Sequence, residues 1–145
     1  MRNSYYKNNI GKKDVSLIKN GKQKLLVFEG FLDFLSYLTL NPVTYYKNDY
    51  LIIHSVSLIL YGIKYFKDYK EVDLYFDNDK AGDKLTNAIL SIQRGEKLSE
   101  ELFIGNREVL EKHLLSFQKQ KTKLTDKRYT FQGYEDVNDY LMHIN

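Results

Sequence analysis

Hydrophobic residues along this chain fall into two kinds of pattern. Short, largely apolar stretches at 24–28, 51–53 and 72–76 are typical of strands buried on both faces of a sheet. Each stretch is followed by a segment in which apolar residues recur every three or four positions, as in a helix packed on one side. The order strand, helix, strand, helix, strand, helix predicts an α/β fold with a parallel sheet.

Local signals give the boundaries of the three predicted helices. The first covers 31–40 and ends at Asn41-Pro42, because proline cannot continue a helix. The second begins at Ser55 or Ser57, either of which can cap its first turn, and runs to about residue 66. The third runs from near residue 81 to about residue 93.

The two ends of the chain give weaker signals. We interpret residues 1–23 as an N-terminal extension with short strands that packs on the domain. Residues 106–121 form a pattern typical of an amphipathic helix, and Tyr129–Phe131 is expected to add a strand. No internal repeat or long linker divides the chain, so we expect one domain with a sheet of about four strands flanked by helices.

Composition excludes several classes of protein. The 145 residues include no cysteine, which excludes disulfides, a cysteine nucleophile and a zinc site built on thiolates. The longest apolar runs are interrupted by polar residues and fall short of the roughly 20 residues that a membrane-spanning helix needs. The N-terminus lacks the apolar stretch of a secretory signal. We therefore expect no membrane association and a cytoplasmic location.

Charge is distributed unevenly although the net charge is only +3. Six lysines occupy the first quarter of the chain, and a second basic cluster includes Lys119, Lys121 and Lys123. The acidic residues with the sharpest spacing lie between the two clusters. This arrangement suits a polyanion such as single-stranded DNA held next to metal ions, and it is equally compatible with an ordinary solvated surface.

Carboxylates follow two of the predicted strands directly. Glu29 comes after the first strand and Asp77 after the third, and Asp79 would point to the same side as Asp77 on an extended chain. If the third strand lies on the other side of the first strand from the second, the strand order reverses between Glu29 and Asp77. The three acids would then meet in one crevice and bind Mg²⁺, or Mn²⁺ in its place.

Residues around these acids suit phosphate. Gly30 and Gly82 would allow close approach of a phosphate backbone, with Lys80 and a helix N-terminus beside them. An EF-hand calcium loop starting at Asp77 is rejected, because its fifth and twelfth positions are alanines. The Asp-Asn-Asp triplet taken alone is also compatible with a simple turn.

The joint pattern resembles a known family. Leu-Leu-Val-Phe-Glu29-Gly30-Phe-Leu-Asp33 and Leu-Tyr-Phe-Asp77-Asn-Asp79-Lys-Ala-Gly82 are similar to the two motifs of TOPRIM domains, in the forms seen in bacterial primases. The segment 135–141 is similar to the one that closes this region in primase-like proteins of plasmids and other mobile elements. Residues 95–122 lie outside the resemblance and are interpreted as an insertion in a TOPRIM domain covering 24–145.

The resemblance implies a Rossmann-like TOPRIM fold and roles for the acids. It implies that Glu29 is a general acid/base and that Asp77 and Asp79 are Mg²⁺ ligands. Asp33, one helical turn after Glu29, is either an outer or weak ligand or an acid favoured by the helix dipole. The three histidines, which lie on different predicted elements, are interpreted as structural or surface residues.

The function implied by the resemblance is that of a DNA primase domain. It would carry out Mg²⁺-dependent nucleotidyl transfer on a single-stranded DNA template with nucleotides. A working primase of this kind also has a zinc-binding module and a basic subdomain. We therefore expect a fragment of a larger protein, with that module or a helicase elsewhere, that is inactive in isolation; a stand-alone TOPRIM protein that works with a partner is the alternative. Two alternatives stay open: a TOPRIM nuclease, and a catalytically silent module that binds DNA or replication proteins.

Overall fold

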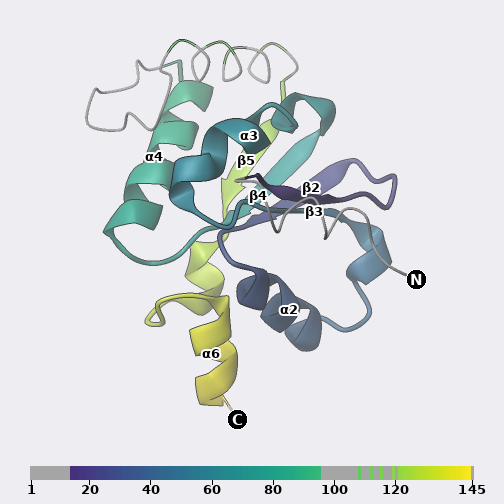
Figure 1. Ribbon diagram of the computed structural model, residues 1–145, viewed down its shortest axis with the longest axis vertical. Coiled ribbons are helices and arrows are strands. Elements are labelled where there is room, and N and C mark those ends of the chain that lie inside the picture. Colours follow the sequence, from purple (N-terminus) through teal and green to yellow (C-terminus); the bar gives the residue numbers. More distant parts are fainter. Residues whose placement is uncertain are drawn as a thin grey trace.

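The computed structural model describes residues 14–95 and 121–144, and the positions 108, 112, 115 and 119 between them. Five strands form one sheet in the order β1-β3-β2-β4-β5 (Figure 1). Strands β3, β2, β4 and β5 run parallel, and β1 pairs antiparallel with β3 at one edge. The strands are β1 (Ser16–Ile18), β2 (Lys24–Phe28), β3 (Asp49–Ile52), β4 (Glu71–Tyr75) and β5 (Lys123–Asp126). The predicted α/β class is confirmed.

Helices cover both faces of this sheet (Figure 1). Four α-helices are described, namely α2 (Phe31–Leu40), α3 (Ile59–Ile63), α4 (Lys80–Gln93) and α6 (Val137–Ile144). Short 3-10 helices join them, namely η1 (Tyr45–Lys47), η2 (Val56–Leu58), η3 (Phe66–Asp68) and η5 (Arg128–Phe131). The first and third predicted helices are confirmed as α2 and α4, almost to the residue.

Two hydrophobic cores separate these layers. Alternate residues of the strands point to opposite faces, so that Val27 packs with α3 and α4 while its neighbour Phe28 packs with α2 and α6. Strands β2, β3 and β4 are buried on both sides, which explains why their sequences are almost continuously apolar. The periodicity that predicted these strands therefore reflects their central place in the sheet.

The chain reverses its winding direction at β2. From β2 it passes to β3 on one side and then crosses to β4 on the other side. Parallel pairing aligns Phe28 with Ile52 and with Tyr75, so the three strands end at the same edge of the sheet. The predicted reversal between the ends of the first and third strands is confirmed, and the acids that follow β2 and β4 lie at this switch point.

Three sequence-based predictions are corrected or refined. The strand expected at Tyr129–Phe131 is wrong, because these residues lie in η5 and the fourth parallel strand is β5. Strand β5 is a polar edge strand in which Leu124 alone is fully buried, so its apolar pattern is too weak to identify it. The second helix is split into η2, α3 and η3, although Ser55 does cap its start.

The amphipathic helix expected at 106–121 lies mostly outside the described residues. Of its described positions, 108, 112, 115 and 119 are helical and exposed, and Lys121 is a turn residue with a φ of 58°. Most of the segment interpreted as an insertion and residues 1–13 of the N-terminal extension lie outside as well. Within the described part of the chain, no helix combines the length and apolarity needed to cross a membrane.

Two buried helical glycines allow close packing, for different reasons. A Cβ on Gly82 in α4 would lie 2.0 Å from the backbone oxygen of Asp77. A Cβ on Gly62 in α3 would meet the Leu51 side chain first, at 3.0 Å. Backbone at the end of a strand cannot move aside as a leucine methyl can, so Gly82 is required for α4 to begin against the end of β4.

We expect Gly82→Ala to lower the free energy of unfolding by about 3 kcal/mol, because the new methyl group must displace the backbone at Asp77. The matched control is Gly62→Ala, for which we expect about 1 kcal/mol, since a side chain can yield and alanine favours the helix. Urea unfolding measures both values. Equal losses in the two variants would show that the contact with Asp77 is not what fixes residue 82.

Candidate metal centre

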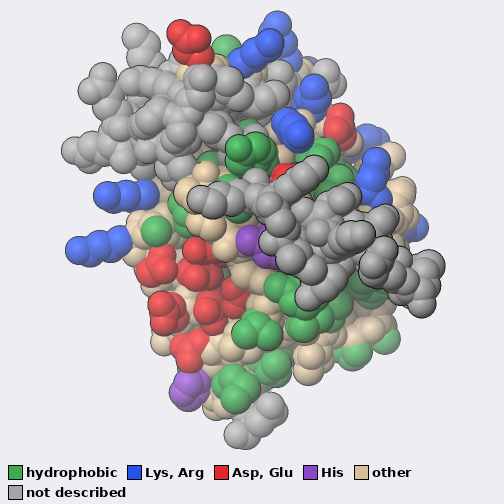
Figure 2. All heavy atoms as spheres, viewed as in Figure 1, with side chains coloured by type: hydrophobic (Ala, Val, Ile, Leu, Met, Phe, Trp, Pro, Cys, Tyr) green, Lys and Arg blue, Asp and Glu red, His purple; other side chains and the backbone are tan. Residues whose placement is uncertain are grey.

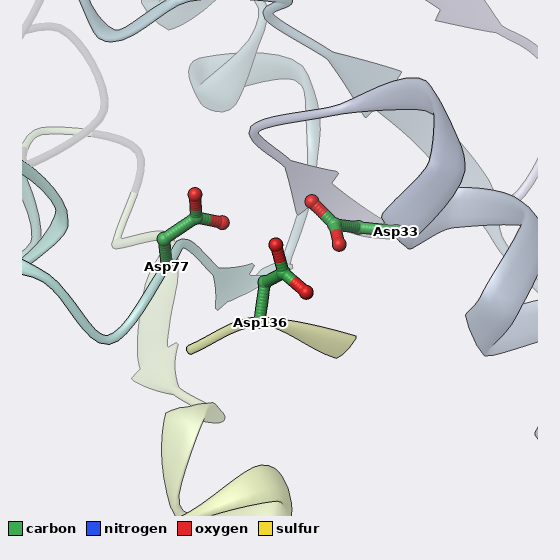
Figure 3. A group of neighbouring side chains, drawn as sticks. All are labelled: Asp33, Asp77 and Asp136. Atoms are coloured by element: carbon green, nitrogen blue, oxygen red, sulfur yellow. The ribbon is translucent and has the colours of Figure 1, made fainter. Parts of the chain in front are cut away.

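Three carboxylates from separate elements meet at the carboxyl edge of the sheet (Figure 3). Asp33 comes from the first turn of α2, Asp77 follows β4, and Asp136 directly precedes α6. One oxygen of each lies within 4.8 Å of the others. Asp136 was not among the predicted site residues. Its signal was an Asp-x-x-Asp pattern before an apolar run, which marks a helix start and says nothing of a site by itself.

Glu29 lies beside this cluster. Its Oε2 is 3.4 Å from the backbone nitrogen of Asp77, so the glutamate leans across from the end of β2 to the end of β4. Glu29 and the three aspartates line one open cleft of about 400 Å³. Figure 2 shows acidic side chains gathered in one patch on this face of the molecule. Of the predicted acids, Glu29, Asp33 and Asp77 are therefore brought together.

Helix N-termini hold two of these carboxylates in place. Asp136 caps α6 by accepting a hydrogen bond from the backbone N–H of Asp139 at 2.7 Å. The backbone N–H of Asn138, also in the first turn of α6, donates to Oδ1 of Asp33 at 3.2 Å. Ser36 of α2 also donates to the Asn138 side chain at 3.0 Å. The first turns of α2 and α6 are thus joined, and the dipole of α6 stabilises both negative charges.

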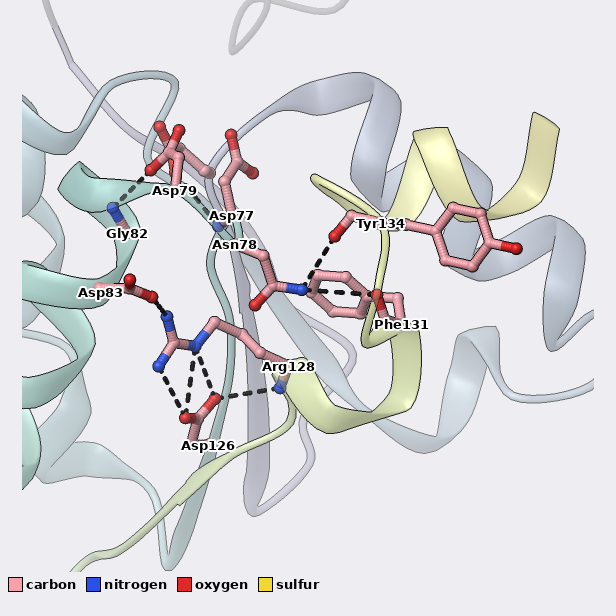
Figure 4. A network of polar contacts seen from close by, with 10 residues as sticks. Asp77, Asn78, Asp79, Gly82, Asp83, Asp126, Arg128, Phe131 and Tyr134 are labelled. Carbon is pink, nitrogen blue, oxygen red and sulfur yellow. Dashed lines mark hydrogen bonds and ion pairs between the residues drawn. The ribbon is translucent and has the colours of Figure 1, made fainter. Parts of the chain in front are cut away.

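Asp79 has a different local role. Its Oδ1 accepts the backbone N–H of Gly82 at 2.7 Å, which caps the start of α4 (Figure 4). It lies outside the three-carboxylate cluster, but its charge acts on both Glu29 and Asp77. The structure therefore separates the two aspartates of the predicted pair, one toward the cleft and one toward α4.

Asn78 ties the end of β4 to the segment before α6 (Figure 4). Its side-chain nitrogen donates to the carbonyl of Tyr134 at 2.9 Å, and its backbone N–H donates to the carbonyl of Glu135 at 2.6 Å. These bonds lock the residue before Asp136 to the residue after Asp77. The side chain points away from the cleft, as the alternation along an extended chain predicts.

Arg128 fixes the other side of the same region. Its guanidinium group binds both oxygens of Asp126 at the end of β5 and also contacts Asp83 in the first turn of α4 (Figure 4). The side chain of Arg128 is only 12% exposed. The hydrogen bond to Asp126 raises the already high pKa of Arg128. The guanidinium group therefore stays charged and links the end of β5 to the first turn of α4.

The cleft strongly disfavours the ionised form of its acids. Burial, together with the charges of Glu29, Asp33, Asp136 and Asp79, raises the pKa of Asp77 to about 8. Burial likewise raises the pKa of Asp33 to about 6 and shifts that of Glu29 upward. Oδ1 of Asp77 is buried and accepts no hydrogen bond from the residues that the structure describes. An unpaired buried oxygen among converging carboxylates fits a hard divalent cation such as Mg²⁺.

The three residues expected to contact phosphate differ in where they lie and how exposed they are. Gly30 lines the cleft, and a Cβ there would lie 3.1 Å from Oδ2 of Asp33. Lys80 is exposed at the first residue of α4. Gly82 is buried against Asp77, so the fold itself accounts for this glycine.

The predicted basic cluster does not lie at the cleft. Lys119, Lys121 and Lys123 are exposed. Lys123 is the first residue of β5 and pairs with Glu71, the first residue of β4. It therefore lies at the amino edge of the sheet, opposite the acids. A nucleic acid that touched both regions would have to cross the length of a five-residue strand, roughly 16 Å.

His54 is a cleft residue that sequence reasoning treated as structural or surface. It follows β3 with a φ of 66°, which is uncommon for a residue with a side chain. Its Nε2 lies 2.6 Å from the hydroxyl oxygen of Ser16 in β1, and it lines the cleft with the acids. Burial lowers the pKa of His54. His143 lies at the end of α6, exposed, with Asp139 at 3.1 Å, and His113 is outside the described residues.

Comparison with known proteins identifies a family and structures of similar fold. The model of a family described as Toprim-like matches residues 26–108, which is more than half of the chain. The primase fragment of the bacteriophage T7 primase-helicase protein has a similar structure, with a TM-score of 0.51 and 20% sequence identity. That match covers 88% of this chain but only 43% of the phage fragment, and it supports the fold alone. No curated protein matches.

The raised pKa values predict how stability changes with pH in the absence of metal. Between the ordinary aspartate pKa of 3.8 and about 8, the folded protein holds a proton at Asp77 that the unfolded chain has lost. This contribution to stability is complete below about pH 4 and disappears as the pH rises through about 8. We therefore expect the free energy of unfolding in EDTA to fall from about pH 5 to about pH 8, with Asp33 acting in the same direction.

Asp77→Asn should flatten that profile and raise stability at the alkaline end, because a neutral amide carries no charge to bury. Urea unfolding at several pH values, read by circular dichroism, measures the slope. Asp68→Asn, at an exposed position in η3, is the control and should keep the slope of the parent protein. A slope in Asp77→Asn equal to that of the parent protein would contradict the electrostatic account of the cleft.

Proposed function

The chain belongs to the Toprim-like family, and on this basis we propose that its acidic cleft binds Mg²⁺ or Mn²⁺ for phosphoryl-transfer chemistry on DNA. The observation that carries the proposal is the meeting of the Asp33, Asp77 and Asp136 carboxylates, together with a buried Asp77 oxygen that has no hydrogen-bond donor among the described residues. A divalent cation would neutralise this charge and satisfy that oxygen.

The acids take separate roles in this proposal. Asp33, Asp77 and Asp136 would hold the cation, which supplies neutralisation of phosphate charge when bound. Glu29 stands beside Asp77 with a raised pKa, so it exchanges a proton closer to neutral pH than a free carboxyl group and suits a general acid/base. Asp79 adds negative charge while it caps α4, and it thereby orients the turn that carries Asp77.

The substrates proposed are a single-stranded DNA template and nucleotides, and the reaction is nucleotidyl transfer. The motifs around Glu29 and Asp77, which resemble those of bacterial primases, favour this choice over other phosphoryl transfers, and the fold likeness to the phage primase fragment agrees with it. Since the chain spans less than half of that fragment, we propose that it works as part of a larger primase-like protein with a zinc-binding module or a helicase. A nuclease or a binding-only module would use the same cleft, and the products formed from template and nucleotides separate the three.

Metal binding is the first test. We expect Mn²⁺ calorimetry to show one or more sites at neutral pH, and we expect Asp77→Asn to weaken binding at least about tenfold, because Asp77 supplies the buried oxygen. Asp136→Asn should act similarly, whereas Asp79→Asn should have a smaller effect. The control is Asp68→Asn, which should bind as the parent protein does. Unchanged affinity in both Asp77→Asn and Asp136→Asn would show that the metal binds elsewhere.

Nucleic-acid binding tests the basic cluster at the far edge. We expect replacement of Lys119, Lys121 and Lys123 by Glu to weaken binding of a long single-stranded DNA and to reduce the log–log salt slope by about 2, the value for three phosphate contacts. Binding of a dinucleotide should not change, because a dinucleotide bound in the cleft is too short to reach these lysines. Fluorescence anisotropy over a range of salt concentrations measures both.

The matched control for this charge reversal replaces three other exposed lysines, Lys47, Lys64 and Lys67, by Glu. It makes the same change in net charge at other surfaces. Equal losses in both triple variants would show that only overall charge matters. Loss of dinucleotide binding in the variant of Lys119, Lys121 and Lys123 would show that these lysines act at the cleft, which would contradict their position at the opposite edge of the sheet.

A further inference from the structure

The acidic cleft has an aromatic and apolar side that a metal site does not require. Phe31 and Leu32 line the same cavity as Glu29 and the three aspartates. Phe31 is 49% exposed and Leu32 is 63% exposed, although both belong to the first turn of a helix whose other face is in the core. Exposed apolar side chains next to buried and half-buried carboxylates contribute nothing to holding a cation, so they call for a different ligand group.

The order of the strands separates the two sides of the cleft. β2, with Glu29 at its end, lies between β3 and β4. His54 follows β3 and its ring is held by the hydroxyl of Ser16, while Asp77 follows β4 and faces Asp136. Phe31 begins α2 directly after the Glu29-Gly30 turn, between these two sides. The cleft therefore combines the rings of Phe31 and His54 with the carboxylates of Glu29 and the three aspartates.

The ring of Phe31 is anchored although it is exposed. Its centroid lies 5.9 Å from that of Phe34, with the planes tilted by 51°. Phe34 is buried and packs in turn against Phe28 and Tyr50. One part of the Phe31 ring is thus supported by the core, and about half of the side chain faces solvent at the cleft. A supported ring with an open surface is what stacking of another ring needs.

A ligand that uses both the carboxylates and the rings has a phosphate, which the cation held by the carboxylates can bind, and a flat ring a few ångströms away. A nucleotide has this form, but a base within a duplex is already stacked on both faces and cannot offer one to a protein ring. We propose that Phe31 is a stacking platform for an unpaired base of the single-stranded nucleic acid whose phosphate is bound at the Asp33, Asp77 and Asp136 cluster. This inference rests on the proposed function and names a residue that holds its substrate.

Two probes with equal charge test the stacking. One is an oligothymidylate of about twelve residues, and the other is an oligomer of the same length in which every nucleotide is abasic. With Mg²⁺ present, we expect the protein to bind the oligothymidylate more tightly than the abasic oligomer. Phe31→Ala should remove this preference by weakening oligothymidylate binding roughly 5- to 100-fold, the range that base–aromatic stacking supports, and should leave the abasic oligomer unaffected.

Three further variants make the result specific. Phe31→Leu keeps an apolar side chain but no ring and should lose the preference as Phe31→Ala does, whereas Phe31→Trp should keep it. The matched control is Tyr61→Ala in α3, since Tyr61 is also 49% exposed but belongs to a helix on the other face of the sheet. Tyr61→Ala should bind both probes as the parent protein does. Mn²⁺ calorimetry should give parental affinity for every variant at residue 31.

The outcomes separate this inference from the proposed function. If the parent protein binds both probes equally in a Mg²⁺-dependent way, or if Phe31→Leu keeps the preference, the stacking role is overturned and the metal site stands. If this surface instead binds an apolar segment of a partner protein, the parent protein should likewise bind both probes equally. If neither probe binds and Mn²⁺ does not bind either, the proposed function fails and the stacking role fails with it.

Discussion

Carboxylates crowd together and repel one another at the switch point of the sheet, and the surrounding helix starts are arranged to hold them there. Parallel strands β2 and β4 end side by side; Glu29 directly follows β2, and Asp77 is the second residue after β4. Asp33 and Asp136 are added from two helices, and burial then raises the pKa of Asp77 to about 8. A fold that minimised its own free energy would have no reason to bury these charges together, so the arrangement stores an unfavourable energy that a cation can release.

Several contacts around the cleft hold the acids against this repulsion. The α6 N-terminus donates backbone hydrogen bonds to Asp136 and Asp33, and Asn78 ties the end of β4 to the segment that carries Asp136. Asp79 and Gly82 fix the first turn of α4 so closely that only glycine fits. Most of these supports are backbone N–H groups at the starts of α4 and α6, and Asn78 adds a side-chain hydrogen bond to a backbone carbonyl.

The sequence was enough to predict the fold class and to place Glu29, Asp33 and Asp77 at the site, whereas β5 and Asp136 were missed for physical reasons. Central strands are buried on both faces, so their apolar runs and the acids after them were recognisable, and the reversal between β2 and β4 followed. β5 was missed because an edge strand needs only one buried side chain, Leu124. Asp136 lies in the segment 135–141 whose resemblance was recognised, but its place at the cleft was missed because it depends on α6 docking against α2, more than a hundred residues away in sequence.

A crystal structure of the protein soaked with Mn²⁺ would show whether the cleft binds a metal, because the anomalous signal of manganese locates the ion without assumptions about the residues. We expect a peak in the cleft, at about 2.1–2.3 Å from carboxylate oxygens of Asp77 and of at least one of Asp33 and Asp136. A well-occupied peak bound only by other residues, or an empty cleft in a crystal at neutral pH with saturating Mn²⁺, would contradict this expectation.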